Sequence, residues 1–336
     1  MAQEGITRYE TAGGARIYRL PVQVFPALRA YVHLVIAGEY VALVDTGSGH
    51  GSSDADLLQG MARIRDEWDE AVDWTDIDRI VLTHAHIDHH GGLNTVRSLT
   101  PAPLAVHELD RRVIVNHEER LTLTRFRLGV FLRRAGVDDQ RRARMLAMYS
   151  GAKDSVRSMP VEDVLRDGDL LDGVFRVIHV PGHCPGQVCL QIDDILLTAD
   201  HVLPNFSLFL SPESLTASNG VDHFLLSLRK VAALSDVRLG LGGHDRPVPD
   251  LGAAVAKIEA TQRQHIERVY EACARPSTIA ELTARLYPFV RDYDELLALQ
   301  KVGAYVEYLD QRGMLAIANL DEVAEDDAAA PRYLAI

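Results

Sequence analysis

The stretch that most constrains this chain is LTHAHIDHHGG, residues 82–92, which holds four histidines and an aspartate within seven consecutive positions. The run DRIVLTH before the cluster is apolar and β-branched, as strands are, and HHGG at its end indicates a turn into another element. A solvated surface run would also hold such side chains, but the flanks argue against it, and a buried imidazole without a partner costs free energy. Because sites of α/β proteins lie at strand ends, the stretch predicts a functional site there.

Length and composition place the chain among ordinary globular proteins. It has 336 residues, 47% of them apolar and 25% charged, which allows a large core and more than one domain. No apolar run approaches the roughly 20 residues of a membrane helix, and the opening MAQEGITRYE lacks the features of a secretory signal. Three cysteines make no disulfide framework. We therefore expect a cytoplasmic protein without a membrane partner, and its net charge of −13 disfavours general nucleic-acid binding.

The apolar pattern predicts two sheets that pack together and are covered by helices. Short strands are expected within residues 15–46, with a hairpin turn at Gly38-Glu39, and again in quick succession within 175–202. Helical spacing is expected over 54–68 and 252–274.

Two segments depart from this pattern. Residues 107–157 are predicted to be helical and basic, with twelve Lys or Arg against seven Asp or Glu, whereas the rest of the chain carries a net charge of −18. Asp138 is expected to cap the second of two helices in this segment. Residues 275–318 look like a separate small module, in which Thr278 and Glu281 have the spacing of a capping box.

Seven side chains carry the donor groups of a predicted metal site. His84 and His86 are two apart, so an extended backbone projects them to the same side, while Asp88 and His89 follow a turn and face a second point. Three further candidates each follow an apparent strand: His183 in VPGHCPG, Asp200 in LLTADHV and His244 in LGGHDRP. Imidazole and carboxylate suit Zn²⁺, and also Mn²⁺ or Fe²⁺. Two metals that share one bridging carboxylate would use all seven groups.

These motifs resemble those of the metallo-β-lactamase superfamily. The resemblance rests on THAHIDHHGG, PGHCPGQ, TAD and GGH, in that order, and covers roughly residues 15–260. It implies an α/β (α+β) fold, namely a four-layer αββα sandwich with the site at one edge between the sheets. It also implies the ligand sets: His84, His86 and His183 for the first metal, Asp88, His89 and His244 for the second, and Asp200 as the bridge. Asp45 in VALVDTG matches a carboxylate that usually supports such a site from behind its ligands.

The expected chemistry is hydrolysis by a hydroxide held between two Zn²⁺ ions, with Fe or Mn as alternative metals. Asp88, which would orient the nucleophile or receive its proton, and Asp200 are the expected catalytic residues. We expect a small ester, thioester or lactone as the substrate. Redox chemistry is disfavoured because flavodiiron relatives usually carry a glutamate at the position of His86, although an iron-dependent persulfide-type oxygenase stays an open alternative.

The same resemblance suggests a division of the chain. A catalytic domain is expected over 1–260, a winged-helix-like module over 261–320 and an acidic, mobile tail over 321–336. This order resembles the β-lactamase-like protein 2 group, whose members include endoribonucleases that act on single-stranded RNA. The near-neutral charge of residues 275–318 disfavours RNA and favours a module that shapes the entrance of the site or forms a homodimer contact. A single-stranded endoribonuclease stays the alternative function.

The basic segment 107–157 is expected to cover the site as a lid, because a family core needs only a short connection there. Its arginines would attract an anionic substrate, such as an acyl thioester or a phosphorylated compound. A second interpretation is that these arginines are solvated or pair with the acidic remainder of the chain.

The remaining histidines and the cysteine beside His183 are expected to serve the structure. His90 and His201 lie beside ligand positions without matching one, and Cys184 is expected to be a small core residue. Surface or packing roles are expected for four more histidines: His107, His117, His179 and His223.

Overall fold

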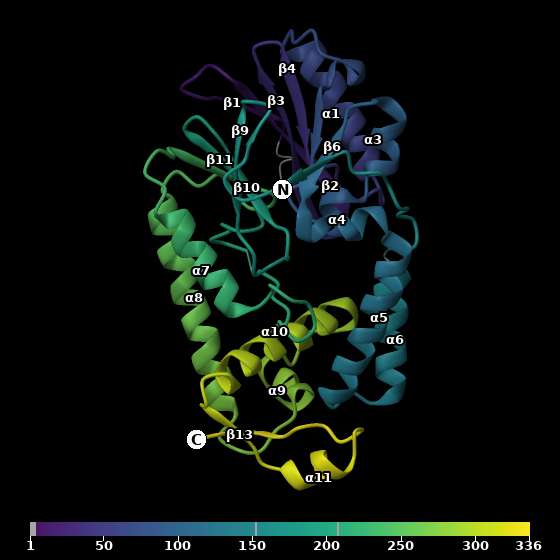
Figure 1. Cartoon of the computed structure of the whole chain (residues 1–336), viewed down its shortest axis with the longest axis vertical. Coiled ribbons are helices and arrows are strands. Elements are labelled where there is room, and N and C mark those ends of the chain that lie inside the picture. Colours follow the sequence, from purple (N-terminus) through teal and green to yellow (C-terminus); the bar gives the residue numbers. More distant parts are fainter. Residues whose placement is uncertain (1–4, 152, 207) are drawn as a thin grey trace.

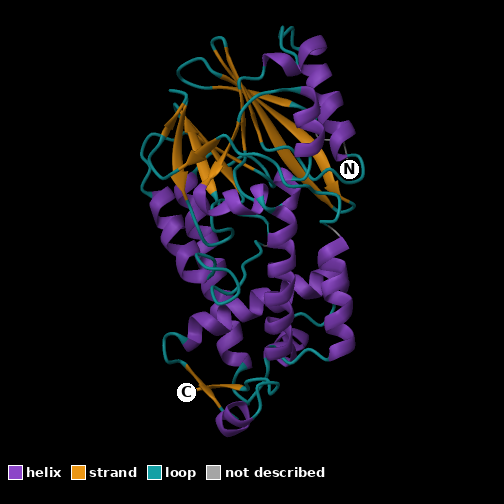
Figure 2. Cartoon of the chain, turned by 45° about the vertical axis from the view of Figure 1, so that its right-hand side comes forward, coloured by secondary structure: helices purple, strands orange, loops and turns teal. Residues whose placement is uncertain are grey.

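Two β-sheets lie face to face in the upper part of the molecule, and a helical region lies below them (Figures 1 and 2). The computed structural model describes residues 5–151, 153–206 and 208–336. The larger sheet has the order β1-β2-β3-β4-β5-β6-β7. Its strands are β1 (Thr7–Glu10), β2 (Arg16–Phe25), β3 (Leu28–Ala37), β4 (Tyr40–Val44), β5 (Arg79–Val81), β6 (Leu104–His107) and β7 (Asp163–Leu165). Strands β1 to β4 are antiparallel, and β4 to β7 are parallel.

The smaller sheet has the order β12-β11-β10-β9-β8. Its strands are β8 (Leu170–Leu171), β9 (Phe175–His179), β10 (Val188–Ile192), β11 (Ile195–Ala199) and β12 (Leu239–Gly242). Only the β11–β12 pair is parallel, so both of these strands end at the same edge. The carboxyl ends of β11 and β12 therefore present their following loops side by side.

Helices cover the outer face of each sheet. On the larger sheet these are α1 (Ser53–Glu67), α3 (Leu93–Leu99) and α4 (Glu108–Val115), and on the smaller sheet α7 (Val221–Ala232) and α8 (Leu251–Ala272). The single turn of α2 (Ile87–His90) lies between β5 and α3 in the chain. A middle core joins the two sheets, with Ile17 and Val35 packed in one cluster with Phe175 and Leu190. Two outer cores hold the helices against the sheets. The predicted four-layer αββα sandwich is confirmed.

The helical region joins parts of the chain that are distant in sequence. It contains α5 (His117–Arg134), α6 (Asp139–Gly151), α9 (Ile279–Leu286) and α10 (Asp292–Asp310), together with the lower end of α8 (Figure 1). Buried Leu128 and Leu132 of α5 share one core with Leu299 and Val302 of α10. The basic segment and the C-terminal segment thus form one packed body.

Several local expectations are confirmed. The hairpin turn separates β3 from β4, Asp138 accepts a hydrogen bond from Arg141 N, and Thr278 and Glu281 form a capping box. Helix α8 (Leu251–Ala272) matches the helical spacing expected over 252–274, while the domain boundary near residue 260 stays a prediction. The acidic tail contains α11 (Leu320–Glu325) and β14 (Tyr333–Ala335), and β14 pairs with β13 (Leu315–Ile317). The winged-helix-like character of this end stays a prediction.

Within the described ranges, no helix combines the length and the apolar character that crossing a bilayer requires. The three cysteines are unpaired and buried.

His33 is a buried histidine of β3 that makes folding sensitive to acid. It is 3% exposed, and its Nε2 has no hydrogen-bond partner among the described residues. Burial, followed by the positive charges of Arg19 and His89, lowers the pKa of His33 to about 3. Between that value and the ordinary pKa near 6.5, the unfolded chain binds more protons, so stability rises with pH and is lost on acidification.

We expect His33→Leu to flatten this acid dependence. Between pH 7 and pH 5, the free energy of unfolding should fall by about 2 kcal/mol more in the native protein than in the variant. The reason is that only the native chain must keep this imidazole neutral in its folded state. Urea unfolding of the metal-free protein at both pH values measures the difference. Equal losses in the two proteins would contradict the assignment.

Candidate metal centre

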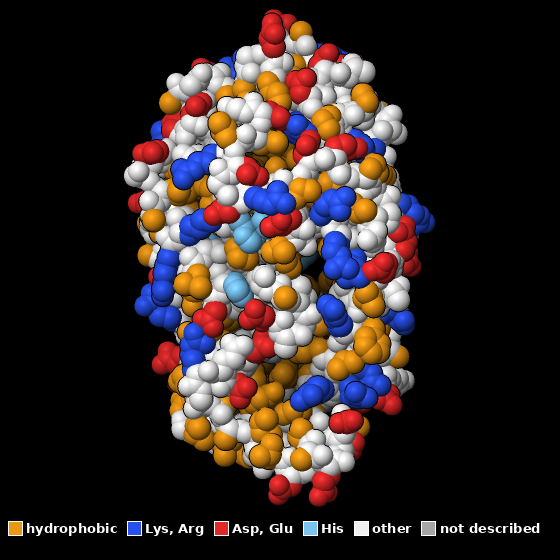
Figure 3. All heavy atoms as spheres, in the orientation of Figure 1, with side chains coloured by type: hydrophobic (Ala, Val, Ile, Leu, Met, Phe, Trp, Pro, Cys, Tyr) orange, Lys and Arg blue, Asp and Glu red, His pale blue; other side chains and the backbone are white. Residues whose placement is uncertain are grey.

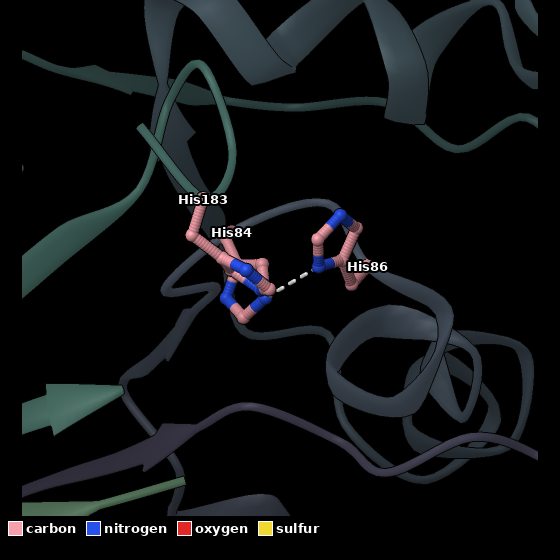
Figure 4. A group of neighbouring side chains, drawn as sticks. All are labelled: His84, His86 and His183. Atoms are coloured by element: carbon pink, nitrogen blue, oxygen red, sulfur yellow. Dashed lines mark hydrogen bonds between the residues drawn. The ribbon is translucent and has the colours of Figure 1, made fainter. Parts of the chain in front are cut away.

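Four of the predicted ligands come from the short connection between β5 and α3. His84 lies between two bends that follow β5, and His86 is extended and precedes the single turn of α2 that carries Asp88 and His89. His84 Nε2 and His86 Nδ1 lie 3.1 Å apart, and His183 joins them from the other sheet (Figure 4). The turn of α2 redirects the chain, which separates the second pair of ligands from the first.

The other three ligands follow strands of the smaller sheet. His183 follows β9, Asp200 follows β11, and His244 follows β12. Gly243 must be a glycine here, because a Cβ atom would lie 2.6 Å from His89 Cε1 and 2.7 Å from Asp200 Oδ1. The candidate ligands that follow strands of the two sheets therefore lie together at one edge of the sandwich.

Asp200 lies at the centre of the cluster. Its Oδ1 is 3.4 Å from His89 Nε2, and its Oδ2 is 3.5 Å from both His183 Nε2 and His244 Nε2. His244 Nε2 is also 3.3 Å from Asp88 Oδ2. The structure therefore brings all seven predicted side chains together, with Asp200 between the two groups.

The ligand imidazoles are held from behind through their other nitrogen. His89 Nδ1 lies 2.8 Å from Asp45 Oδ2, His183 Nδ1 lies 2.7 Å from the Phe209 carbonyl oxygen, and His244 Nδ1 lies 2.5 Å from the Arg29 carbonyl oxygen. Such partners fix the ring orientation and leave Nε2 to face the centre.

Asp45 lies directly behind the ligands, as expected. Thr83 N and Thr83 Oγ1 donate to its two carboxylate oxygens at 2.8 Å, and His89 lies against the same carboxylate. Its backbone has a φ of 64°, which lies in the left-handed region. Asp45 thereby ties the end of β4 to the start of the ligand loop.

Burial and mutual repulsion prepare the first group of imidazoles as neutral donors. Burial, followed by the charges of the neighbouring imidazoles, lowers the pKa of His84 well below its usual value. Burial and His183 likewise lower the pKa of His86, and burial lowers the pKa of His183. A metal ligand must be deprotonated, so these three are ready to bind a cation at neutral pH.

His89 and His244, in the second group, lie among the carboxylates, and their pKa values shift in the opposite direction. Burial alone would lower the pKa of His89, but the charges of Asp200 and Asp45 outweigh it and raise that pKa well above its usual value. The pKa of His244 is raised in the same way, by Asp200 and Asp88 against burial. Burial would raise the pKa of Asp88 and of Asp200, but the facing imidazoles hold both below the usual range. Without a cation, protons on His89 and His244 therefore balance the charges of Asp88 and Asp200, and a bound cation would take the place of those protons.

The donor set fits divalent metal ions. Three groups, each with ligand atoms within 4.8 Å of one another, are His84–His86–His183, His84–His89–Asp200 and Asp88–His89–His244. Two nitrogens bound to one tetrahedral zinc lie about 3.3 Å apart, close to the 3.1 Å between His84 and His86. Among the described side chains, His89 Nε2, His183 Nε2 and Asp200 Oδ1 are buried without a hydrogen-bond partner. A cation would satisfy these buried atoms.

Asp110 of α4 is a buried residue of the site that the sequence did not single out. It is 1% exposed and accepts hydrogen bonds from Ala85 N and Gly186 N, each at 2.8 Å, and from Cys184 Sγ at 3.2 Å. Burial raises its pKa despite these donors. Asp110 therefore ties the loop of His84 and His86 to the loop of His183; its isolated position in the sequence carries no signal of this role.

The histidines expected to serve the structure lie outside the ligand set. His90 faces His117 at 6.1 Å between ring centroids, and His201 packs on Phe224 at 5.2 Å. His107 stacks on His179 at 3.9 Å. Cys184 is buried, as expected, although its thiol also donates to Asp110.

Aromatic side chains and a lysine lie beside the cluster. Phe206 stacks on His244 at 5.2 Å, and Phe209 lies 6.3 Å from the rings of His86 and His183. On the side of Asp88, the half-buried Lys153 places its ammonium 3.5 Å from the ring centroid of Tyr149. Burial lowers the pKa of Lys153, while the charges of Tyr293 and Asp88 oppose that shift. These residues come from three parts of the chain, so only the fold reveals them.

Comparison with protein families and curated proteins gives consistent matches. The family model described as the metallo-beta-lactamase superfamily matches residues 26–249. The probable metallo-hydrolase YqjP of Bacillus subtilis is 23% identical and is aligned over 82% of this chain and 86% of its own. The human acyl-coenzyme A thioesterase MBLAC2 is 30% identical over 52% of this chain; the match spans 58% of that protein.

Solved structures share the fold over nearly the whole chain. A metallo-beta-lactamase family protein from Thermus thermophilus has a TM-score of 0.78 at 24% identity, covering 95% of this chain and 98% of that one. A beta-lactamase domain protein from Burkholderia ambifaria has a TM-score of 0.71 at 22% identity, covering 98% and 93%. The similarity therefore extends through the helical region below the sandwich.

Proposed function

The chain belongs to the metallo-beta-lactamase superfamily of metallo-hydrolases, and we propose that it hydrolyses thioesters with a pair of zinc ions. The central position of Asp200 supports a pair of ions, because its two oxygens face different histidines at 3.4 and 3.5 Å. Nitrogen-rich ligand sets of this kind suit zinc, with iron or manganese as alternatives. The similarity to MBLAC2, named an acyl-coenzyme A thioesterase, supports a thioester over a lactone or an oxygen ester.

Metal ions in this cluster would supply an activated water at neutral pH and a Lewis acid for the substrate carbonyl. Asp88 is the carboxylate of the cluster that is half-buried rather than buried, which supports the proposal that it orients the attacking water and receives its proton. Its low pKa keeps it ionised before the reaction. Phe206 and Phe209 shield the imidazoles behind them from bulk water.

The basic helix α5 supports an anionic substrate such as a coenzyme A thioester. Arg125, Arg127, Arg133 and Arg134 are exposed and, within the described part of the chain, form no ion pair. Lys and Arg side chains gather on the right-hand side of the face in Figure 3, around a hollow between the sandwich and the helical region. Arginine binds phosphate groups in a bidentate manner, which suits the phosphates of such a leaving group. We propose that the basic segment borders the entrance of the site as a lid.

The proposal is tested by a turnover screen on one zinc-loaded sample of known metal content. The panel contains an acyl-coenzyme A, a lactone, a phosphodiester and short single-stranded RNA. We expect the acyl-coenzyme A to be hydrolysed fastest, with kcat/KM at least tenfold above the others, and its KM to rise with salt as screening weakens the arginine contacts. Cleavage of the RNA in preference to the thioester would instead establish the endoribonuclease alternative.

We also propose a cytoplasmic location. The three unpaired cysteines support it, because thiols stay reduced in the cytoplasm.

For the C-terminal region, we propose either a contact with the substrate or a contact between two copies of the chain. Its exposed apolar side chains, such as Phe289, support such a contact.

A further inference from the structure

A small pocket lies between the loop that follows β11, helix α8 and helix α10. Its volume is about 250 Å³, and none of the seven predicted metal ligands is among the described residues that line it. Apolar side chains such as Leu203 and Ile258 form part of the wall. The loop, α8 and α10 each also contribute a polar side chain, namely His201, Gln262 and Lys301. A few polar groups that converge on a partly apolar cavity are typical of sites for small molecules.

The charge of the pocket is positive. Lys301 of α10 is only 7% exposed, so its ammonium group is buried. Burial, followed by the charge of Arg268, lowers the pKa of Lys301 to about 8, and the group therefore stays mostly protonated at pH 7. No aspartate or glutamate belongs to the lining, as far as the structure describes it. A cation is costly to take out of water, and a negatively charged ligand beside it offsets that cost.

A chain of hydrogen bonds leaves the amide NH₂ group of Gln262 available as a donor. Tyr305 Oη donates to Gln262 Oε1 at 2.6 Å, which uses the one hydrogen of this hydroxyl. His265 Nδ1 lies 3.0 Å from the same hydroxyl and must therefore be the donor of that second hydrogen bond. The carbonyl oxygen of Gln262 is thus occupied, whereas its NH₂ group donates to no residue that the structure describes.

His201 adds a buried imidazole to the wall of the pocket. The residue is 0% exposed, and neither ring nitrogen has a hydrogen-bond partner in the described ranges of the chain. One face of the ring packs on Phe224, which also lines the pocket. Because buried polar groups of native proteins are almost always hydrogen-bonded, an unsatisfied imidazole at a pocket indicates a bound molecule that completes it.

We propose that this pocket binds a small oxyanion, either a carboxylate with a short carbon chain or a phosphate. Lys301 supplies the positive charge, and Gln262 and His201 donate hydrogen bonds to the oxygens, which are stronger when the acceptor is charged. The volume is below the roughly 300–1,000 Å³ of pockets for drug-sized ligands, so the ligand is small. Phe206 separates this site from the metal centre, since it lines the pocket and stacks on His244 at 5.2 Å. The proposal does not depend on the thioesterase activity.

Titration calorimetry with sodium butyrate and with sodium phosphate tests the proposal on the zinc-loaded, full-length protein at constant ionic strength. Lys301→Gln removes the charge and should weaken binding at least tenfold. Gln262→Glu keeps the shape of the side chain but adds a negative charge, and it should weaken binding by a similar factor. Lys230→Gln is the matched control and should leave the affinity unchanged, because Lys230 is an exposed lysine of α7 outside the pocket. Circular dichroism shows whether each variant is folded.

Chelation of the zinc separates the pocket from the metal centre, since oxyanions also bind zinc. Binding in the pocket should persist with unchanged affinity in the metal-free protein. Tighter binding of butyrate supports a carboxylate as the ligand, and tighter binding of phosphate supports a phosphate. Binding that is lost with the zinc and is equal in the native protein and the folded variants shows that the oxyanions bind only at the metal centre, and it overturns the proposal. The absence of binding by either ion also overturns it.

Discussion

Replacing Asp200 with asparagine should abolish metal binding by the cluster and lower kcat/KM for the best substrate at least a thousandfold. Asn has nearly the same shape but no charge, whereas Asp200 faces His89, His183 and His244 at 3.4–3.5 Å. A neutral amide cannot balance two cations, and its NH₂ group would point a donor at an imidazole nitrogen or an ion. Loss of about 4 kcal/mol of transition-state stabilisation corresponds to the thousandfold decrease.

Metal content and turnover are measured on the same preparation of the variant. Asp236→Asn serves as the matched control, because Asp236 is an exposed aspartate on the loop after α7, and it should keep full metal occupancy and activity. The variant should remain folded by circular dichroism, which separates ligand loss from unfolding. Near-native turnover of Asp200→Asn with stoichiometric zinc would refute the central role of this carboxylate.

Replacing Asp110 with alanine should destabilise the protein and disturb the site in a single step. The substitution leaves the buried Ala85 N and Gly186 N without their acceptor, which costs about 3 kcal/mol of unfolding free energy. It also frees the loops of His84, His86 and His183 from each other, because Asp110 is the side chain that ties them together. Loss of a residue that orients metal ligands lowers affinity or activity by about 10–100-fold.

The measurements for Asp110→Ala are the denaturation midpoint and the zinc affinity. Asp110→Asn gives an intermediate case, since it keeps one acceptor oxygen and presents a donor in place of the other. Both measurements should therefore fall in the order native, Asn, Ala. A variant that loses stability but retains native zinc affinity would show that Asp110 supports the fold without positioning the ligands.

The sequence was most informative where chemistry and local spacing coincide. The crowded run at 82–92 indicated four ligands directly, because histidine and aspartate in such density have few other uses at the end of a strand. His183, Asp200 and His244 were found because each follows an apolar run, whereas Asp45 was found only through the resemblance of VALVDTG to a family motif. The capping box at Thr278 and the cap at Asp138 were also predictable, since a cap depends on residues only three positions apart.

Residues whose role depends on distant neighbours could not be predicted from the sequence. Asp110 looks like an ordinary acidic residue in the first turns of a helix, and only the packing of α4 reveals that it joins two loops. The predicted lid and the predicted C-terminal module are separated by more than a hundred residues, yet α5 and α10 share one core.

The sequence by itself determined which side chains could bind a metal ion, because a residue's type and its spacing from its chain neighbours are both read directly from the sequence. The tertiary structure decided how those groups share space, with Asp200 between the two groups of ligands and Asp110 behind their loops. The physical reason is that distances between separate strands and helices are set by packing of whole cores, and packing depends on many apolar contacts that no local pattern encodes.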